Sequence, residues 1–277
     1  MSLTVFFVVL LGAALHASWN AIVKVGGDKL LTTVLMAILS ALLAVPILPF
    51  LPAMHPDAYP WLAISTAIHV VYFLLVANSY RLADMSRTYP LMRGTAPLLV
   101  ALVGLVFLGE RLSEFAWAGI LVICTGILSM VVGRMGGQGK GIGLAALNSV
   151  VICGYTLVDG AGVRASGSPI AYTLWLALTS VVPLLIYILA TRRREFITYA
   201  GKNWRPCLVA AIGTTTSYGL ALWAMTKAPI AVVAALRETS IFFALLISVF
   251  LLGEKPGRLR IASAAAICCG AMLLRLA

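Results

Sequence analysis

Ten runs of about 20 mostly apolar residues follow one another along this chain, separated by short polar connections. A helix of roughly 20 residues crosses the hydrocarbon core of a bilayer, because each residue rises about 1.5 Å and the core is about 30 Å thick. The 277 residues leave no room for a further soluble domain. We therefore predict an all-α integral membrane protein. The expected helices are Leu3–Val23, Leu31–Phe50, Trp61–Tyr80, Ser86–Leu108, Phe115–Val132, Ile142–Asp159, Ile170–Ala190, Cys207–Thr226, Ile230–Leu252 and Leu259–Leu276.

The charge of the chain fits a bilayer better than a nucleic acid. Only 10% of the residues are charged, whereas soluble domains carry about 25%. The net charge of +11 comes from Lys and Arg that lie mostly in the connections between apolar runs. Positive charges in such connections set membrane orientation, and no basic face interleaved with aromatic residues is present. We expect a lipid bilayer around the chain and no nucleic-acid partner.

No sequence pattern points to a metal, a cofactor or catalysis. The cysteines lie in apolar runs without zinc or redox spacing, so we expect them to pack as small apolar residues. The Gly-rich stretch at the midpoint has Arg134 and Gly141 where a phosphate-binding loop requires Gly and Ser or Thr. The first apolar run lacks a basic leader and a cleavage site, and we interpret it as a permanent helix. The cysteines are Cys124, Cys153, Cys207, Cys268 and Cys269.

The two halves of the chain resemble each other. Leu91–Glu110 aligns with Ala235–Glu254 without a gap, and both segments end in Leu-Gly-Glu. An arginine inside an apolar run, Arg93, falls on Arg237 in this alignment. An internal duplication predicts two repeats, residues 1–133 and 142–277, joined by a Gly-rich linker at 134–141.

Five crossings reverse the direction of the chain, so the second repeat must be inverted relative to the first. Fourteen Lys and Arg residues fall in the odd-numbered connections and four on the opposite side. By the positive-inside rule, the odd-numbered connections, including Arg192–Arg194, are cytoplasmic and both termini face outward. Transporters with inverted repeats hold their substrate near the midplane, between the halves.

The repeat unit also carries a family pattern. Pro97 is followed by the closing sequence Leu108-Gly109-Glu110-Arg111-Leu112, then by a helix rich in small residues with Gly119 and Gly126. Together with the second Leu-Gly-Glu, this resembles the EamA-type branch of the drug/metabolite transporter superfamily over the full length. The resemblance implies ten helices in two inverted five-helix repeats, and export or exchange of metabolites across the bacterial inner (plasma) membrane.

Three further features qualify the resemblance. The opening His16-Ala17-Ser18-Trp19-Asn20 is similar to permeases found beside phosphonate-use genes. Ile241 stands where the second repeat would match Pro97. Leu3–Val23 contains no carboxylate, whereas small four-helix multidrug members of the superfamily use a glutamate in their first helix. Proton-driven export of lipophilic cations is therefore not expected.

Arg93 and Arg237 are the main candidate substrate-binding residues. Each lies inside an apolar helix, where a charged side chain costs about 2.5 kcal/mol or more unless it faces a cavity or a partner. A guanidinium group pairs with both oxygens of a carboxylate or phosphonate. The alternative is that helix carbonyls or a carboxylate such as Glu238 neutralise the arginines, which then only lock the halves together.

Other polar groups could complete the site. Glu238 lies deep in a predicted helix and is a candidate proton carrier. His16, Asn20 and Lys24 share one face of the first helix beside Trp19, where they could contact substrate or serve as interhelical hydrogen-bonding groups. Tyr155 belongs to a similar polar stripe with Asn148 and Asp159, although we expect Asp159 near the membrane interface. The remaining candidates, which could equally be packing residues, are Tyr89, His69, Tyr72, Tyr218 and Trp223.

The sequence therefore favours a secondary transporter of alternating-access type. We expect an exporter or exchanger of a small polar metabolite that bears an anionic group, such as an amino acid or organophosphonate. A membrane enzyme acting on a lipid-linked substrate would need a cluster of catalytic groups near one interface, and no such motif occurs. A non-transporting membrane scaffold would tolerate neutral replacements of Arg93 and Arg237. The oligomeric state is left open, and a monomer would suffice.

Overall fold

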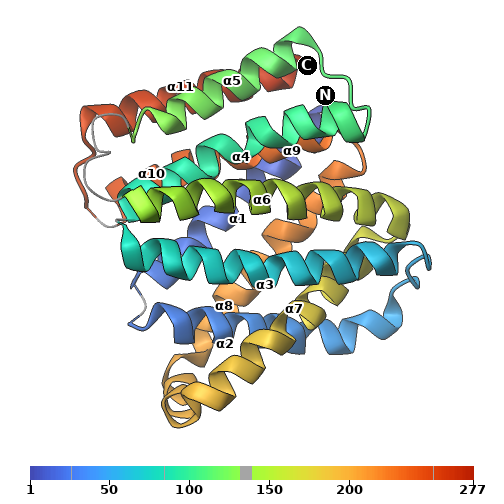
Figure 1. Ribbon diagram of the computed structural model, residues 1–277, viewed down its shortest axis with the longest axis vertical. Coiled ribbons are helices and arrows are strands. Elements are labelled where there is room, and N and C mark those ends of the chain that lie inside the picture. Colours follow the sequence, from blue (N-terminus) through green and yellow to red (C-terminus); the bar gives the residue numbers. More distant parts are fainter. Residues whose placement is uncertain (26, 84, 132–138, 252) are drawn as a thin grey trace.

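The computed structural model describes residues 1–25, 27–83, 85–131, 139–251 and 253–277, and these residues form helices and short connections (Figure 1). Figure 1 shows α5 beside α11 along one edge of the bundle and α2 with α7 at the opposite edge. The helices are α1 (Leu3–Val25), α2 (Lys29–Ile47), a 3₁₀ turn η1 (Leu48–Phe50), α3 (Ala58–Leu82), α4 (Met85–Phe107), α5 (Glu114–Leu128), α6 (Gly139–Ser166), α7 (Pro169–Thr191), α8 (Arg193–Met225), α9 (Ile230–Arg237), α10 (Ser240–Phe250) and α11 (Arg258–Leu276).

The described helices have the length and composition of membrane spans. Nine segments, with α9 and α10 counted as one, are long and apolar enough to cross a bilayer, and α5 adds a shorter apolar helix of 15 residues. Large apolar side chains such as Phe7, Leu42 and Ile186 are exposed on the outside of the bundle. A surface of this kind is stable only against lipid. The predicted all-α membrane fold is confirmed.

The helix contacts have the pattern of two inverted repeats, α1–α5 and α6–α11. Helix α3 of the first repeat packs against α6, the first helix of the second, and α8 packs against α1 in the corresponding way. Helices α2 and α7 contact each other, as do α5 and α11. Both termini lie at one end of the bundle, where Arg275 Nη1 donates to the Met1 carbonyl over 2.7 Å. We call this end the terminal side.

Two helices extend further than the sequence predicted. Helix α6 begins at Gly139, so the last residues of the expected linker 134–141 are helical, while residues 134–138 lie outside the described part. The same helix continues past Asp159 to Ser166. Asp159 therefore lies within a helix of 28 residues rather than at its end, and it is fully buried. The expectation of an interfacial Asp159 was wrong.

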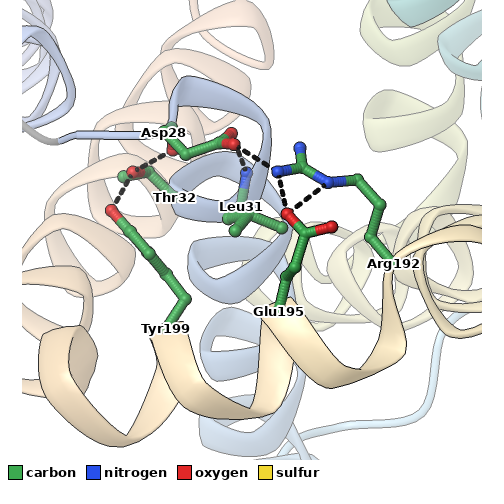
Figure 2. A network of polar contacts seen from close by, with 6 residues as sticks. All are labelled: Asp28, Leu31, Thr32, Arg192, Glu195 and Tyr199. Carbon is green, nitrogen blue, oxygen red and sulfur yellow. Dashed lines mark hydrogen bonds and ion pairs between the residues drawn. The ribbon is translucent and has the colours of Figure 1, made fainter.

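Helix α8 begins at Arg193, well before the expected start at Cys207. Its 33 residues span about 50 Å, which exceeds the hydrocarbon thickness of about 30 Å. Figure 2 shows how polar contacts attach this extension to the start of α2. Arg192 Nη2 donates to Asp28 over 2.8 Å and also pairs with Glu195, while the Thr32 and Tyr199 hydroxyls lie 2.6 Å apart. The polar residues of the extension are thus part of an ordered helix outside the hydrocarbon core.

Asp28 also begins α2. Its carboxylate accepts a hydrogen bond from the Leu31 amide over 3.0 Å, the usual arrangement of an N-terminal cap. Partial desolvation raises the pKa of Asp28, but the Leu31 amide and Arg192 outweigh it and lower the pKa below its ordinary value. The ionised carboxylate therefore holds α2 and α8 together at neutral pH.

The ninth predicted span is interrupted. Helix α9 ends at Arg237 and α10 begins at Ser240, with Glu238 and Thr239 between them. The amides of Glu238 and Thr239 bond to carbonyls three residues earlier, so the interruption is a tighter, 3₁₀-like turn. All residues from Ile230 to Leu236 are buried, which places this turn inside the bundle. Interrupted membrane helices are a common way to build a substrate site.

Candidate functional site

The centre of the bundle contains an ion pair between the two repeats. Arg93 of α4 donates from Nε to Oε2 of Glu238, at the turn between α9 and α10, over 2.9 Å. Their side chains are only 12% and 5% exposed. Glu238 thus pairs with an arginine of the other repeat and not with its sequence neighbour. One alternative raised from the sequence, neutralisation of Arg93 by Glu238, is what the structure contains.

Arg237 has a different environment. Its guanidinium carbon lies 5.0 Å from the centre of the Tyr218 ring, in a cation–π arrangement. Among the residues that the structure describes, Arg237 has no ion pair with a carboxylate. Both Arg237 and Arg93 nevertheless lie within electrostatic range of Glu238. Arg237 therefore lies close to the Arg93–Glu238 pair without forming an ion pair of its own among the described residues.

Aromatic rings border this charged group. His69 and Tyr155 have ring centres 4.5 Å apart, and Tyr72 meets Tyr155 edge-on at 5.6 Å. Tyr155 is within electrostatic range of both arginines. Tyr218 meets His69 edge-on at 6.5 Å. The structure therefore brings four of the aromatic candidates from the sequence, His69, Tyr72, Tyr155 and Tyr218, next to the arginines.

A small cavity lies between these groups. Its free volume is about 10 Å³, which is room for about one water molecule. Arg93 Nη2 is buried and has no hydrogen-bond partner. An unpaired buried donor is costly, and it is the group that an incoming acceptor would satisfy. The cavity is lined by Arg93, Ala96, Pro97, Val100, Ile152, Tyr155, Thr156, Ala234, Arg237 and Glu238.

The candidates on the first helix divide into two groups. His16 is partly buried and within electrostatic range of Arg93 and Arg237. Trp19 packs edge-on against His16, at 5.0 Å between ring centres, and its Nε1 is buried without a partner. Asn20, in contrast, donates to the His16 carbonyl of its own helix over 2.7 Å. We therefore place His16 and Trp19 at the candidate site and Asn20 in a local structural role.

Of the two remaining candidates, Tyr89 and Trp223, the first lies near the charged group and the second does not. Tyr89 of α4, one turn before Arg93, is within electrostatic range of Arg93 and Glu238. Trp223, near the end of α8, packs against the main apolar core instead. No contact joins Trp223 to the arginines within the described residues. Trp223 therefore behaves as a packing residue.

Asp159 is the buried carboxylate that sequence reasoning left out of the site. It accepts a hydrogen bond from the Tyr172 hydroxyl over 3.1 Å and another from the Tyr218 hydroxyl. Tyr218 thus contacts Asp159 through its hydroxyl and Arg237 through its ring. The signal was available: Asp159 lies one turn after Tyr155 on the same helix face. It was missed because Gly160, Gly162 and Arg164 suggested the end of the helix.

The Gly-Glu pairs of the two repeats, Gly109-Glu110 and Gly253-Glu254, have the same backbone conformation and hydrogen bonding. Gly109 and Gly253 have φ of +64° and +65°, in the left-handed region that favours glycine. The amide of Glu110 bonds to the Gly104 carbonyl and the amide of Glu254 to the Ser248 carbonyl, each six residues apart. A glycine in the left-handed conformation just after the last turn is a common end of a helix. The glycine thus ends the helix and turns the next glutamate toward its partner.

Each of these glutamates pairs with a cation of the other repeat. Glu254 accepts from Lys24 Nζ, at the end of α1, over 2.6 Å. Glu110 accepts from Arg164 Nη2, near the end of α6, over 2.7 Å. Helices α1 and α6 are the first helices of their repeats, so the two ion pairs correspond to each other. Figure 1 shows the connection from α4 to α5 at the terminal side and the connection from α1 to α2 at the opposite end, so the two ion pairs lie at opposite ends of the bundle.

The two ion pairs are not equally enclosed. The Glu110 side chain is 10% exposed, whereas that of Glu254 is 40% exposed. Glu110 also accepts from the Ile230 amide over 2.9 Å, which caps α9. Arg164 donates further to the carbonyls of Met225 and Ala228. Among the described residues, the contacts around Glu110 are therefore more enclosed than those around Glu254, which also accepts from the Ser248 hydroxyl.

Within the described residues, no three His, Cys, Asp or Glu side chains gather where they could hold a metal ion. The chemistry of the candidate site is instead that of two guanidinium groups, two carboxylates and several aromatic rings.

Comparisons with known proteins agree with this fold. The model of the EamA-like transporter family matches residues 3–132 and 139–276, which together include nearly the whole chain in two copies. A solved structure described as "Crystal structure of protein" aligns with a TM-score of 0.70 at 18% identity, over 98% of this chain and 96% of that one. At this identity the similarity shows the fold alone. Among curated proteins, no sequence matches.

Proposed function

The chain belongs to the EamA-like transporter family, and we propose that it is a secondary transporter for a small metabolite that carries an anionic group, such as an amino acid or an organophosphonate. The observation that carries this proposal is the buried Arg93 Nη2, which has no hydrogen-bond partner although Arg93 lines the central cavity, while Arg237 lines the same cavity without an ion pair among the described residues. A carboxylate or phosphonate would satisfy both groups.

Glu238 acts as an internal substitute for the substrate in this proposal. In the structure it occupies Arg93 Nε and leaves Nη2 unpaired. A guanidinium group presents its donors in a planar fork that suits two oxygens of one anion. An incoming anion that engages this fork would compete with Glu238, and the released carboxylate would loosen the contact between α4 and the turn after α9. Substrate binding is thereby linked to a contact between the repeats.

The two corresponding ion pairs support alternating access. Arg164–Glu110 and Lys24–Glu254 each join the two repeats, one at each end of the central site. An inverted pair of similar repeats can exchange conformations, so that opening at one end accompanies closure at the other. The more enclosed contacts around Glu110 indicate the terminal side as the closed end in this conformation. The small central cavity implies that this conformation must open before a metabolite enters.

The site residues follow from these contacts. We propose that Arg93 and Arg237 bind the anionic group and that His16, Trp19, His69, Tyr72, Tyr89, Tyr155 and Tyr218 surround the rest of the substrate. Asn20 and Trp223 are omitted because their contacts lie elsewhere. We further propose the bacterial inner membrane as the location, with residues 192–194 in the cytoplasm, and export or exchange as the direction of transport.

A catalytic role or a purely structural role receives less support. A membrane enzyme would place its reactive groups where a lipid-linked substrate could reach them, whereas Arg93, Glu238 and Asp159 are buried in the middle of the bundle. A scaffold gives no reason for an unpaired guanidinium nitrogen beside a cavity.

A thermal-shift screen on detergent-purified protein tests the proposal, because a ligand that binds only the folded state raises the melting temperature by mass action. The probes are L-alanine, L-glutamate, methylphosphonate and, as a cationic control, tetraphenylphosphonium. We expect at least one anion-bearing probe to stabilise the wild type and not Arg93→Gln. Stabilisation by tetraphenylphosphonium alone would contradict an anion site.

A further inference from the structure

We propose that Asp159 binds and releases a proton during the transport cycle, an inference that rests on the proposed function and names its coupling ion. The sequence suggested Glu238 for this role. In the structure, however, Glu238 is held by Arg93, and Asp159 is the other buried carboxylate of the central region.

The surroundings of Asp159 separate it from an ordinary structural carboxylate. It has no exposed surface, and within the described residues no Lys or Arg forms an ion pair with it. Its hydrogen-bond donors are neutral hydroxyls, those of Tyr172 on α7, Tyr218 on α8 and Ser65 on α3. A buried negative charge without a cationic partner is expensive in a membrane helix, where such groups commonly belong to ion or proton pathways. Asp159 is therefore placed to exist in two protonation states.

The two states differ in their hydrogen bonds. As a carboxylate, Asp159 accepts from both tyrosine hydroxyls. When it takes up a proton, an O–H bond forms on one carboxyl oxygen, which then becomes a donor and no longer accepts in the same way. One of the two tyrosine hydroxyls must then turn to a new partner or lose its hydrogen bond. No oxidation, reduction or leaving group is involved.

Tyr218 connects this change to the substrate site. Its hydroxyl contacts Asp159, and its ring lies against the guanidinium of Arg237. A change in the Tyr218 hydrogen bond therefore acts on the side chain that positions Arg237. Proton binding at Asp159 can therefore affect anion binding at Arg237 through one aromatic side chain, that of Tyr218.

Several other polar and charged groups lie near Asp159, on its own helix and on neighbouring ones. From α3, Ser65 and His69 lie close, with Ser65 Oγ 3.2 Å from His69 Nδ1, and His69 is within electrostatic range of Asp159. From α6 itself, Tyr155 is within electrostatic range of Asp159, and also of Arg93 on α4 and Arg237 on α9. His69 is thus the alternative proton carrier that an experiment must separate from Asp159.

A metal cation fits this pocket less well than a proton. Both tyrosine hydroxyls point their hydrogens at Asp159, so they present donors and not the oxygen ligands that Na⁺ or a divalent cation would need. No cluster of three acidic, histidine or cysteine ligands occurs among the described residues.

Infrared difference spectroscopy on protein reconstituted in lipid tests the proposal without any substrate. The carbonyl stretch of a protonated, buried carboxylic acid is followed as the pH is changed across the neutral range. We expect a titrating band in the wild type that disappears in Asp159→Asn and persists in Glu238→Gln and His69→Gln. Asp57→Asn, which removes an exposed carboxylate of the same type, should leave the band unchanged. Tyr218→Phe, which removes one hydroxyl donor, should move the pH midpoint.

A band that persists in Asp159→Asn, or the absence of any titrating buried carboxyl band in folded wild type, would overturn the proposal. If Asp159→Asn does not fold, a midpoint that is the same in Tyr218→Phe, Tyr172→Phe and wild type would also overturn it.

A second arm uses proteoliposomes that enclose a pH-sensitive dye, with an imposed gradient of L-glutamate or methylphosphonate. We expect the wild type to move protons with the probe, and Asp159→Asn to exchange labelled for unlabelled probe without proton movement. Exchange and proton movement that are both retained in Asp159→Asn would contradict the proposal. Absence of flux for both probes in the wild type, together with a titrating Asp159 band, would count against the proposed substrate class and leave proton binding by Asp159 supported.

Discussion

Arg93 Nε and Glu238 Oε2 lie 2.9 Å apart and belong to opposite repeats. The pair neutralises two charges in the interior and at the same time ties α4 to the turn after α9. Anion binding and locking of the halves, which the sequence presented as alternatives, are therefore compatible functions of one contact. The same arginine lines the central cavity and leaves one buried nitrogen without a hydrogen-bond partner.

Substitutions in the Arg93–Glu238 pair should affect the stability of the protein and its transport activity in different ways. Arg93→Gln leaves Glu238 without its ion-pair partner, and breaking a buried pair in this way costs about 3–5 kcal/mol. We expect Arg93→Gln/Glu238→Gln to recover much of this stability, because neither member of the pair is left as an unpaired charge, but not to recover flux. Thermal unfolding of the two single variants and the double variant measures the coupling. Additive losses of stability would show that the two residues do not interact.

The ion pair on the terminal side should control access from that side. Glu110→Gln removes the charge that holds Arg164 and leaves one side-chain oxygen that can still accept from the Ile230 amide. We expect it to increase the labelling of a cysteine placed at Thr156, which lines the central cavity, by a reagent added on the terminal side. Glu254→Gln is the matched control at the other end and should have the opposite effect.

The exchange variant Arg164→Glu/Glu110→Arg tests the same contact. It restores the opposite charges in reversed order, and we expect it to recover part of the wild-type labelling pattern. Equal labelling from the terminal side in wild type, Glu110→Gln and the exchange variant would exclude a gating role.

The Lys24–Glu254 pair should persist over a wide pH range. The hydrogen bond from Lys24, followed by that from Ser248, lowers the pKa of Glu254 below its ordinary value of 4.5. A carboxyl with a lowered pKa in the folded state stabilises the fold above its ordinary value and loses this contribution as the pH falls through the lowered one. We expect wild type and Glu254→Gln to show a constant difference in melting temperature at neutral pH, and convergence only in acid. A difference that shrinks between neutral and mildly acidic pH would contradict this.

The membrane orientation can be tested by cysteine labelling. Lys202 lies on the exposed part of α8 that extends beyond the hydrocarbon core. We expect a cysteine introduced at this position, in a variant without the native cysteines, to resist an impermeant maleimide in intact cells and to react in opened membranes. Labelling in intact cells would place residues 192–202 outside.

The sequence was sufficient for the general architecture because membrane helices are specified by composition and length. Apolar runs of about 20 residues mark the spans, and an odd number of spans per repeat requires inversion. Helix ends were less predictable. The polar start of α8 lies outside the hydrocarbon core, where hydrophobicity carries no signal, and contacts such as Arg192–Asp28 make it helical. The interruption at Glu238 was unexpected, since Ile241 replaces the proline that would suggest it.

The candidate site was predictable where a charge had to be explained and less so elsewhere. Arg93 and Arg237 were found because an arginine in an apolar helix requires a partner. Asn20 and Trp223 share the residue types of the site, but their contacts depend on helix rotation and packing that composition does not report. Asp159 was excluded by a helix end placed too early, because Arg164 can lie in the span only through its contacts with Glu110 and the nearby carbonyls.

The most direct test of the central claim is counterflow of labelled L-glutamate and methylphosphonate into proteoliposomes that contain wild type, Arg93→Gln, Arg237→Gln or Arg193→Gln. Arg193 is an exposed arginine at the start of α8 and serves as the matched control. We predict that uptake of at least one probe falls about tenfold or more in Arg93→Gln and in Arg237→Gln, a change of about 1.4 kcal/mol, and remains at the wild-type level in Arg193→Gln. Undiminished uptake in folded Arg93→Gln and Arg237→Gln would contradict an anion site formed by the two buried arginines.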